Sequence, residues 1–400
     1  MSFLSNRVQA LKPSPTLALA AKAKALKDSG LDVISLSVGE PDWDTFGEIK
    51  DVGIEAIQRG QTKYTAANGL PELRKAVAEQ FLRDFGVQYE ASEVTVASGA
   101  KFAIFSALQA VINPGDEVLI PSPYWVSYPS MVELAQGKPV IIPCGREQSF
   151  KLSAQQLRAH IGSKTKMLIL NSPSNPTGGM YSDSEWAELG QVLKDNPQAL
   201  VLSDDIYNRL VFNQRGVAPH LLESCPELKS RCISINGVSK SYSMTGWRIG
   251  WALGPQEIIQ AMNNYQSQST SCAAAFSQIA ATAALERAEE SVKASVQVLR
   301  QRRDFIVSEL QKIAGIQVNP PEGAFYVWPQ VDAFFGKRLG GKEIHDSKDF
   351  AQALLEAEKV ALVPGAEFGL EGFVRISYAL EQSRMAEAVE RIKRFVSNRT

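Results

Sequence analysis

Apolar and polar residues alternate with two different spacings in the middle of the chain. From about residue 94 onward, short β-branched runs alternate with longer stretches whose apolar residues recur at helical spacing. The short runs predict strands and the longer stretches predict helices. Strands are expected at VTVAS, EVLIPS, PVIIPC, KMLILNSPS, ALVLSDDIY, RCISING and WRIGWALG, and helices at KFAIFSALQAVI, from Trp125 onward, and at SDSEWAELGQVL. Such alternation is typical of an α/β sheet with helices on its faces.

The pattern changes after about residue 290. A long charged helical stretch is followed by strand-like AFYVWP and FVRISYA and by a closing helix. A chain of 400 residues is long enough for more than one domain. We predict a large domain at 46–290 and a smaller α+β domain at 291–400, and we expect 1–45 to form an N-terminal arm that joins the small domain. No repeat or flexible linker is visible, so one compact unit is expected.

Charge and cysteine content exclude several classes of function. Lys and Arg number 42 and Asp and Glu 43, so no basic field attracts nucleic acid or anionic lipid, and a small-molecule substrate is the better expectation. The four cysteines lack CxxC spacing and histidines number three. We therefore predict no metal site and no disulfide framework, and we expect a reduced, cytoplasmic setting.

The N-terminal region contains a short apolar stretch and is basic. Its most apolar stretch, 16–26, is interrupted by Lys22 and Lys24 and is too short to span a membrane. The first 27 residues are basic, which leaves a transit peptide open. We prefer a mature N-terminal arm, because helical sequence begins almost at once.

Polar clusters follow directly after the predicted strands. They lie at 98–101, 123–125, 171–178, 204–207 and 237–240. In open α/β sheets, ligands bind outside the carboxyl ends of the strands. We therefore expect these five loops to converge on one crevice.

Two cations stand in an unusual setting in the segment NGVSKSYSMTGWRIG. Lys240 and Arg248 lie among small and hydroxylated residues, and no acidic residue is near enough in sequence to pair with either one. A phosphate group would suit Arg248, because guanidinium binds phosphate in a bidentate manner. The strand-to-helix turn around Gly99 offers free backbone N–H groups to the same phosphate. Taken alone, an N-cap and a structural salt bridge explain these features as well.

Four further side chains complete a recognisable set. Asp204 closes a strand, Tyr207 follows it, Asn175 lies in a turn-rich segment, and Trp125 follows another strand. Each one alone fits a cap, core or turn role. Together with a lysine that can form a Schiff base, they match pyridoxal 5′-phosphate (PLP), whose ring nitrogen, ring oxygen, ring face and phosphate each need a partner. Burial beside the cationic cofactor should lower the pKa of Lys240 and free its amine.

Longer motifs extend this match over essentially the whole chain, from LKPSPT to FVRISYA. They are LSVGEPD, TKYTAANGLPELR, SGAKFAI, PSPYWVSYP, NSPSNPTG, SDDIY, SKSYSMTGWRIG, PEGAFYVWP and RISYA. In this set the chain resembles the class I and II aminotransferases, which are PLP enzymes of fold type I, and specifically their bacterial aspartate and prephenate aminotransferase branch. The resemblance implies an α/β fold, in which a large PLP-binding domain carries a mainly parallel seven-stranded sheet sandwiched by helices beside a smaller α+β domain.

The resemblance also implies individual roles around the cofactor. Lys240 resembles the Schiff-base lysine that moves a proton between the substrate's Cα and the cofactor's C4′. Asp204 resembles the partner of the pyridinium nitrogen, Tyr207 and Asn175 those of the 3′ oxygen, and Trp125 the stacking ring. A further set resembles the phosphate cradle: Ser98, Gly99, Ala100 and Arg248.

The chain departs from the family pattern in two places near these residues. Some aminotransferases have a phosphate-binding serine three residues before the lysine, where this chain has Gly237. Ser239, adjacent to the lysine, is the candidate in its place, and the phosphate contact of this loop stays open. Asp205 stands in SDDIY where glutamate is frequent. We expect little effect there, because the position lies outside the cofactor ring.

Substrate recognition is also inferred from the resemblance. Gly39 and Arg375 resemble the groups that hold the substrate's α-carboxylate, and Trp125 and Asn175 are expected to be further substrate-binding residues. Lys12 lies in LKPSPT, which in this branch folds over the site and meets the distal carboxylate of a dicarboxylic substrate. Lys101 either assists there or is an ordinary first-turn helix lysine. Tyr64 resembles a tyrosine from the other subunit, which implies a homodimer with a shared site.

We therefore expect ping-pong amino transfer between L-aspartate and 2-oxoglutarate, with prephenate as a second acceptor. An aromatic or broad-specificity aminotransferase is the alternative. A PLP-dependent lyase would use the same Lys240 and Asp204 but break a different bond. A non-catalytic regulator would need an attached DNA-binding domain, and the aminotransferase-like region leaves no residues for one.

Overall fold

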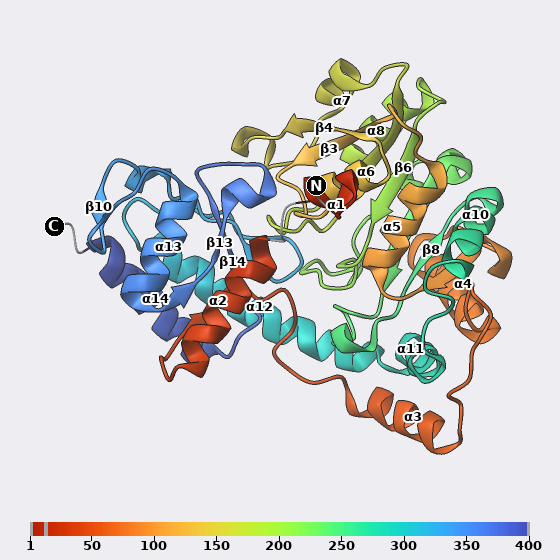
Figure 1. Ribbon diagram of the computed structural model, residues 1–400, viewed down its shortest axis with the longest axis horizontal. Coiled ribbons are helices and arrows are strands. Elements are labelled where there is room, and N and C mark those ends of the chain that lie inside the picture. The colour runs from red at the N-terminus through yellow and green to blue at the C-terminus, as the bar shows by residue number, and fades with distance from the viewer. Residues whose placement is uncertain (1–2, 12–14, 398–400) are drawn as a thin grey trace.

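A seven-stranded sheet forms the centre of the computed structural model, which describes residues 3–11 and 15–397 (Figure 1). The strand order is β2-β8-β7-β6-β5-β3-β4. The strands are β2 (Val94–Ala97), β3 (Glu117–Ser122), β4 (Lys138–Pro143), β5 (Thr165–Asn171), β6 (Leu200–Asp204), β7 (Cys232–Gly237) and β8 (Gly250–Leu253). β8 runs antiparallel to both of its neighbours, and the other strands share one direction. The predicted mainly parallel sheet is confirmed.

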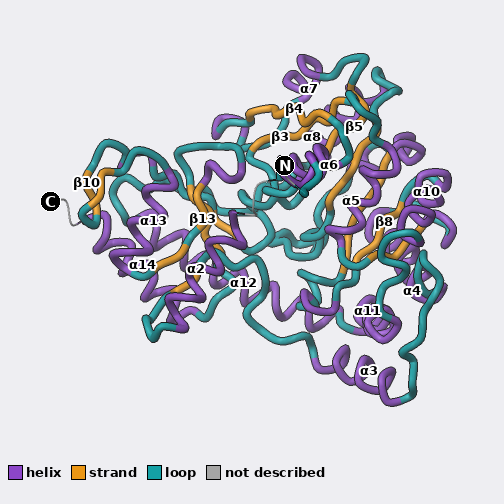
Figure 2. Tube along the Cα trace, viewed as in Figure 1, coloured by secondary structure: helices purple, strands orange, loops and turns teal. Residues whose placement is uncertain are grey.

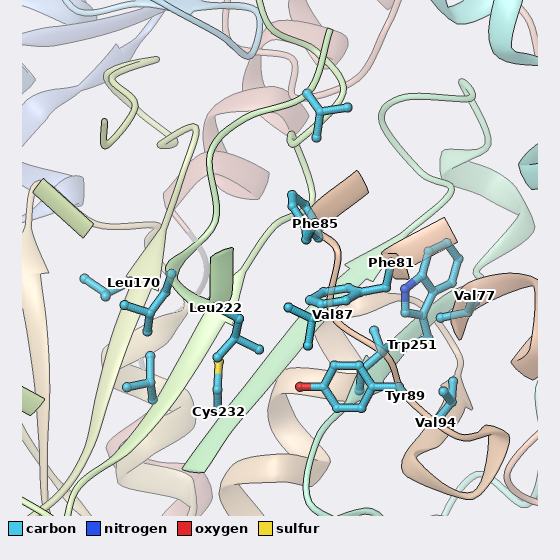
Figure 3. Packing of buried hydrophobic residues seen from close by; sticks show 14 of the residues in the cluster. Val77, Phe81, Phe85, Val87, Tyr89, Val94, Leu170, Leu222, Cys232 and Trp251 are labelled. Carbon is cyan, nitrogen blue, oxygen red and sulfur yellow. The ribbon is translucent and has the colours of Figure 1, made fainter. Parts of the chain in front are cut away.

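Helices cover both faces of this sheet (Figure 2). They are α3 (Gly47–Gln58), α4 (Pro71–Phe85), α5 (Ala100–Val111), α6 (Tyr128–Leu134), α7 (Ala154–His160), α8 (Asp183–Lys194), α9 (Leu221–Ser224), α10 (Gln256–Ser267) and α11 (Ala275–Arg287). Because successive side chains of a strand point to opposite faces, Val201 and Leu202 belong to different cores. One core packs against α4 and contains Phe81 and Trp251 (Figure 3). The other lies under α5, α6 and α10.

Local sequence explains where these elements begin and end. The interior of β5 is a continuous buried apolar run, as expected of a parallel strand covered on both faces. α8 begins with a capping box between Ser182 and Glu185. α4 begins with Pro71 and ends at Gly86, whose φ of 69° is the left-handed conformation that glycine adopts without steric cost.

The C-terminal region packs around a second core, which also takes in Ile206 and Tyr207 from the segment after β6. Three long helices, α12 (Glu289–Gln311), α13 (Ser347–Glu358) and α14 (Gln382–Ser397), accompany an antiparallel sheet of β13 (Val363–Pro364), β14 (Val374–Ser377) and β9 (Tyr326–Val327). A hairpin joins β10 (Arg338–Leu339) and β11 (Lys342–Glu343). Phe325, Phe350 and Phe395 lie at the centre of this core. α12 runs from the helices around the large sheet towards these elements (Figure 1).

The N-terminal segment contacts both regions. It contains α1 (Asn6–Ala10), α2 (Pro15–Asp28) and β1 (Ile34–Ser35), and β1 pairs in parallel with β12 (Val360–Ala361). Farther along, Oγ1 of Thr45 donates to the carbonyl of Ser243, and Oγ of Ser243 donates to the carbonyl of Trp43. The division into domains at residues 45 and 290 stays a prediction, which the separate cores and the β1–β12 pair support.

Across 3–11 and 15–397, no helix combines the length and the apolar character that a membrane crossing requires.

Candidate active site

A cavity of about 500 Å³ lies at the carboxyl ends of the parallel strands. Each of the five predicted loops contributes at least one lining residue, and the N-terminal segment and the C-terminal region close the remaining sides. The lining comprises Ser37, Val38, Gly39, Glu40, Ala100, Lys101, Ile104, Trp125, Asn171, Asn175, Asp204, Ile206, Tyr207, Ser239, Lys240, Thr245, Arg248, Tyr326 and Arg375. Segments far apart in sequence therefore meet at one place, as expected for an open α/β sheet.

Lys240 lies in the loop that follows β7, and its amine points across the cavity. Nζ donates a hydrogen bond to the carbonyl of Gly39. The pKa of Lys240 is lowered to about 8, chiefly by burial and also by the charges of Arg375 and Arg248, whereas Glu40 and Asp204 oppose the change. A larger fraction of the amine is therefore neutral near pH 7 than in a solvent-exposed lysine.

Asp204 ends β6 and is buried, with 5% of its surface exposed. Oδ2 accepts a hydrogen bond of 2.6 Å from the hydroxyl of Tyr128, and Oδ1 accepts one of 3.3 Å from the backbone N–H of Ile206. Burial raises the pKa of Asp204 to about 6, and the nearby Asp205 adds to the rise, whereas Tyr128 and Lys240 oppose it. The carboxylate is thus a strong hydrogen-bond acceptor and lacks a close cationic partner, so it suits a protonated ring nitrogen.

Tyr207 and Asn175 lie on the C-terminal side of the cavity. The hydroxyl of Tyr207 is 3.0 Å from that of Tyr326, and both phenols are buried. The carbonyl oxygen of the Asn175 side chain accepts a hydrogen bond of 3.0 Å from Nη1 of Arg375. Asn171 holds the same turn, because its Oδ1 accepts from the backbone N–H of Asn175.

Arg375 is a buried cation on β14. Nη2 donates to the carbonyl of Ser37 at 2.8 Å, and the guanidinium lies 4.4 Å from the ring centroid of Tyr326 and 5.1 Å from that of Phe368. Its Nε has no hydrogen-bond partner, and no carboxylate within residues 3–11 and 15–397 pairs with it. A buried, unpaired guanidinium at a cavity wall is suited to bind an anionic ligand.

Arg248 reaches the N-terminus of α5 from the turn that precedes β8. Its Nη1 donates to the carbonyl of Thr245 at 2.7 Å. A Cβ on Gly99, which has φ +88°, would overlap the guanidinium, and a Cβ on Gly250 would overlap the backbone of Ala100. The glycines therefore permit a close approach between Arg248 and the helix N-terminus, where backbone N–H groups and the helix dipole favour an anion. Among the described residues Arg248 forms no ion pair, which argues against a structural salt bridge.

The ring of Trp125 forms another wall of the cavity. It packs edge to face with Tyr128 at a centroid distance of 5.3 Å, and Nζ of Lys101 lies 4.9 Å from its centroid. Burial lowers the pKa of Lys101, and the charge of Arg248 contributes to the change. Lys101 therefore lines the cavity while the residue stays exposed to solvent.

Some predicted residues do not line the cavity. Ser98 and Gly99 lie behind it, in the turn that positions Ala100. Tyr64, between α3 and α4, has 92% of its surface exposed. Lys12 lies outside the described residues.

Several residues in the cavity or in contact with its lining were not predicted from the sequence. Tyr128 and Tyr326 make the hydrogen bonds to Asp204 and Tyr207, and Glu40 accepts a hydrogen bond of 2.6 Å from Thr245. Both tyrosines belong to the motifs PSPYWVSYP and PEGAFYVWP. Their position inside site motifs was therefore the available signal.

Comparison with known proteins identifies the class. The sequence matches the family "Aminotransferase class I and II" over residues 31–392, and the chain belongs to this family. It is 48% identical over 397 residues to the "Aspartate/prephenate aminotransferase" of Cereibacter sphaeroides, covering 99% of each chain. It is 47% identical over 396 residues to the "Probable aspartate/prephenate aminotransferase" of Rickettsia bellii, covering 98% of this chain and 99% of the relative.

Solved structures give the same result. The crystal structure of the aspartate aminotransferase from Rhizobium meliloti matches with a TM-score of 0.96 and 43% identity, covering 100% of both chains. The aspartate aminotransferase from Thermus thermophilus with maleate matches with a TM-score of 0.91 and 38% identity, covering 99% of this chain and 100% of that chain. The protein is therefore an aminotransferase of fold type I that depends on PLP.

The residues present fit PLP. The cavity presents a lysine whose pKa is lowered to about 8, a buried carboxylate without a close cation, and a helix N-terminus with Arg248 beside it. A fourth side is the aromatic face of Trp125. These four features correspond to the aldehyde, the ring nitrogen, the phosphate and the ring face of the cofactor.

Proposed function

We propose that the protein transfers amino groups between L-aspartate and 2-oxoglutarate by a ping-pong mechanism, and that it also aminates prephenate. The observation that carries the proposal is the buried, unpaired guanidinium of Arg375 in the same cavity as Lys240 and Asp204. An anion site beside a reactive lysine suits an α-amino acid. The names of the relatives from Cereibacter sphaeroides and Rickettsia bellii support both acceptors.

The proposed cofactor contacts follow the geometry. Lys240 holds PLP covalently through Nζ, Asp204 meets the ring nitrogen, and Tyr207 and Asn175 meet the 3′ oxygen. Trp125 covers one ring face. The phosphate is assigned to Ala100, Ser239 and Arg248, which line the cavity. The assignment of Ser98 and Gly99 to the same cradle rests on the family resemblance.

When bound, PLP supplies an electron sink for the bonds around the substrate's Cα. Proton transfer and control of the cofactor's protonation are assigned to side chains of the protein. Lys240 would be the base that removes the Cα proton and later delivers it, and its lowered pKa suits this work near neutral pH. The carboxylate of Asp204 keeps the ring nitrogen protonated, since burial without a close cation makes it a strong acceptor.

Orientation of the substrate is assigned to Arg375. Nη1 and Nη2 are fixed by Asn175 and Ser37, so the guanidinium plane is held in place before the substrate arrives. A bidentate contact with the α-carboxylate then fixes the direction of the Cα–H bond. The carbonyl of Gly39 lies at the same wall and accepts from Lys240.

The distal carboxylate of aspartate is assigned to Lys101 and Lys12. Lys101 lines the cavity above Trp125. This position supports the assisting role over that of an ordinary surface lysine. Lys12 lies outside the described residues, and its assignment rests on the resemblance of LKPSPT.

The substrate proposal is tested by half-reactions. PLP-loaded protein is mixed in turn with aspartate, glutamate, phenylalanine and alanine while the visible band of the bound cofactor is followed. Loss of the band with aspartate, and its return with 2-oxoglutarate or prephenate, is the expected result. A stronger response to phenylalanine would indicate an aromatic aminotransferase, and no response to any amino acid would favour a lyase. Lys240→Ala should show no turnover, and residual steady-state transamination would refute its assignment.

We further propose a homodimer in which Tyr64 completes the partner's site. The support is its 92% exposure in the single chain together with the family resemblance. The proposal is tested by refolding Lys240→Ala mixed with Tyr64→Ala. Each variant alone should be impaired, whereas mixed dimers contain one site with both residues intact and should regain activity. Activity no higher than the sum of the two parents would contradict a shared site.

We also assign the protein to the cytoplasm. All four cysteines are free, and Cys144, Cys225 and Cys232 are buried thiols, as is usual under reducing conditions. Fractionation of the source cells tests this assignment.

A further inference from the structure

Behind Asp204 lies a second buried carboxylate that the proposed chemistry does not use. Asp205 is 3% exposed and directly follows Asp204 at the end of β6. Because side chains alternate along a strand, Asp205 points to the face that it shares with Ser203, away from the face of Asp204. That face carries the core under α4, where Phe81 and Phe85 lie (Figure 3).

Polar contacts from two neighbouring segments hold this carboxylate. Oγ of Ser203 donates to Oδ1 of Asp205 at 2.6 Å. Nε2 of His220 lies 3.2 Å from Oδ2 and 3.1 Å from Oγ of Ser234. Ser203 and Ser234 are register partners of β6 and β7, so the two strands bring these groups together. Apart from this contact with Nε2 of His220, Oδ2 has no hydrogen-bond partner among the described residues, and Asp205 lines a void of about 10 Å³.

The hydrogen bonds of His220 determine the position of its ring proton. Nδ1 accepts a hydrogen bond of 3.0 Å from the backbone N–H of Leu222, which caps α9. Nδ1 therefore carries no proton, and Nε2 is the protonated nitrogen that faces Asp205 and Ser234. The ring is 2% exposed and packs against Phe81 and Phe85 at centroid distances of 5.2 and 4.7 Å. A neutral His220 can orient the carboxylate of Asp205 but does not neutralise it.

No cation is available to neutralise it either. The titratable side chains around Asp205 are Asp204, Tyr128, Tyr89, Cys232, His220 and Asp84. Asp84 pairs with Arg209 at 2.5 Å. Within the described ranges, no lysine or arginine forms an ion pair with Asp205.

We propose that Asp205 is a positioning residue for the cofactor's ring nitrogen and acts through Asp204. Its carboxylate, oriented by Ser203 and His220, places a second negative charge behind Asp204, so that a protonated ring nitrogen is held more tightly. This inference rests on the proposed function. The rise in the pKa of Asp204, to which Asp205 contributes, agrees with it. The position was expected from the sequence to matter little, whereas the structure gives it a buried and specific setting.

The matched variants are Asp205→Asn and Asp205→Glu. An asparagine can turn its oxygen towards Nε2 of His220 and its amide towards Oγ of Ser203, so shape and hydrogen bonds survive while the charge is lost. The first readout is the dissociation constant of PLP from cofactor-free protein. Loss of one partly screened charge should weaken binding by about tenfold in Asp205→Asn, and Asp205→Glu should restore most of the loss. Equal affinity in wild type and Asp205→Asn would overturn the proposal.

A spectroscopic readout separates this role from a purely structural one. In protein loaded with ring-¹⁵N PLP, the nitrogen resonance reports whether the ring carries its proton. The proton should be lost at a lower pH in Asp205→Asn than in wild type, and a structural defect alone would not shift this titration in one direction. An unchanged titration would contradict the role.

A second pair of variants keeps the test independent of how well Asp205→Asn folds. His220→Gln retains a donor near the place of Nε2, and His220→Asn retains an acceptor for the N–H of Leu222 but withdraws the donor. We expect PLP affinity close to wild type for His220→Gln and weakened affinity for His220→Asn. The reverse order would overturn the orienting role of His220. If wild type bound PLP without transaminating, the proposed function would fall, and these affinities would still decide on Asp205.

Discussion

The hydrogen bond between Tyr128 and Asp204 can be tested by the replacement Tyr128→Phe. Both side chains are buried, and the hydroxyl donates to Oδ2 at 2.6 Å. A hydrogen bond to a charged acceptor contributes about 1.5–3 kcal/mol and one between neutral groups about 0.5–1.5 kcal/mol. The charged form of Asp204 therefore loses about 1–1.5 kcal/mol more than the neutral form. Since 1.36 kcal/mol corresponds to one pKa unit, the pKa should rise by about one unit.

The assay is an infrared titration of the carboxyl band of Asp204 in cofactor-free protein, with the spectrum of Asp204→Asn subtracted. Burial already raises the pKa of Asp204 to about 6, so Tyr128→Phe should move the midpoint to about 7. The control is Tyr378→Phe, which removes a buried hydroxyl that donates to the carbonyl of Ala324, far in sequence from Asp204. An unchanged or lower midpoint in Tyr128→Phe would refute the reasoning.

Stability should follow with a defined sign. The folded state holds the Asp204 proton more tightly than the unfolded state, so stability falls as pH rises from the unfolded pKa to the folded one, from about 4 to about 6 in wild type. In Tyr128→Phe this window extends to about 7. The variant should therefore lose about 1.4 kcal/mol more at pH 8.5 than at pH 5. Urea unfolding at the two pH values measures the difference, and a loss independent of pH would contradict the proposed coupling.

Three further predictions concern the same cavity. Gly99→Ala should lower stability by about 1–3 kcal/mol and weaken PLP binding, because at φ +88° its Cβ would overlap Arg248. The control is Gly86→Ala, where φ is +69° and the space around the Cβ is open. This control should lower stability by about 1 kcal/mol and leave PLP affinity unchanged. Burial lowers the pKa of Lys240 to about 8. The rate at which PLP attaches covalently to cofactor-free protein should therefore rise nearly tenfold for each pH unit up to about pH 8 and level off above it. Stopped-flow absorbance measures this rate, and equal rates at pH 6.5 and 9 would refute the assignment. Lys101→Gln should lower kcat/KM for aspartate about tenfold relative to alanine, and an equal loss for both substrates would show that Lys101 does not contact the distal carboxylate.

The strands of the large sheet were largely predictable because their apolar runs are short, continuous and bounded by polar turns. EVLIPS corresponds to β3 from Glu117 to Ser122. Boundaries set by tertiary contacts were not predictable. The helix expected from Trp125 begins at Tyr128, where Pro129 occupies its first turn, and the ladder of β9 within AFYVWP contains only Tyr326 and Val327.

The candidate site, like the fold, was predictable only in part. Lys240, Asp204 and Asn175 follow strands whose ends meet at one edge, so spacing and residue type together predicted that they would lie close together. The hydrogen-bond partners of Tyr128 and Tyr326 depend on how segments distant in sequence pack together. The presence of a tyrosine in the sequence does not show which partner its hydroxyl has. Asp205 points away from the cavity, and only the fold shows that His220 reaches it.

The two walls of the cavity belong to different hydrophobic cores. Lys240 follows a strand of the large sheet, whereas Arg375 lies on β14, whose neighbours Val374 and Ile376 pack in the C-terminal core. Local unfolding proceeds in cooperative units that follow such cores. Mild denaturant or proteolysis that loosened only the C-terminal core, which includes Tyr207, would leave a protein that still holds its cofactor through Lys240 and Asp204 but cannot position an amino acid. The absorbance of the bound cofactor would then overestimate the fraction of active protein in a preparation. The ratio of turnover to bound cofactor would measure how well the two cores are docked.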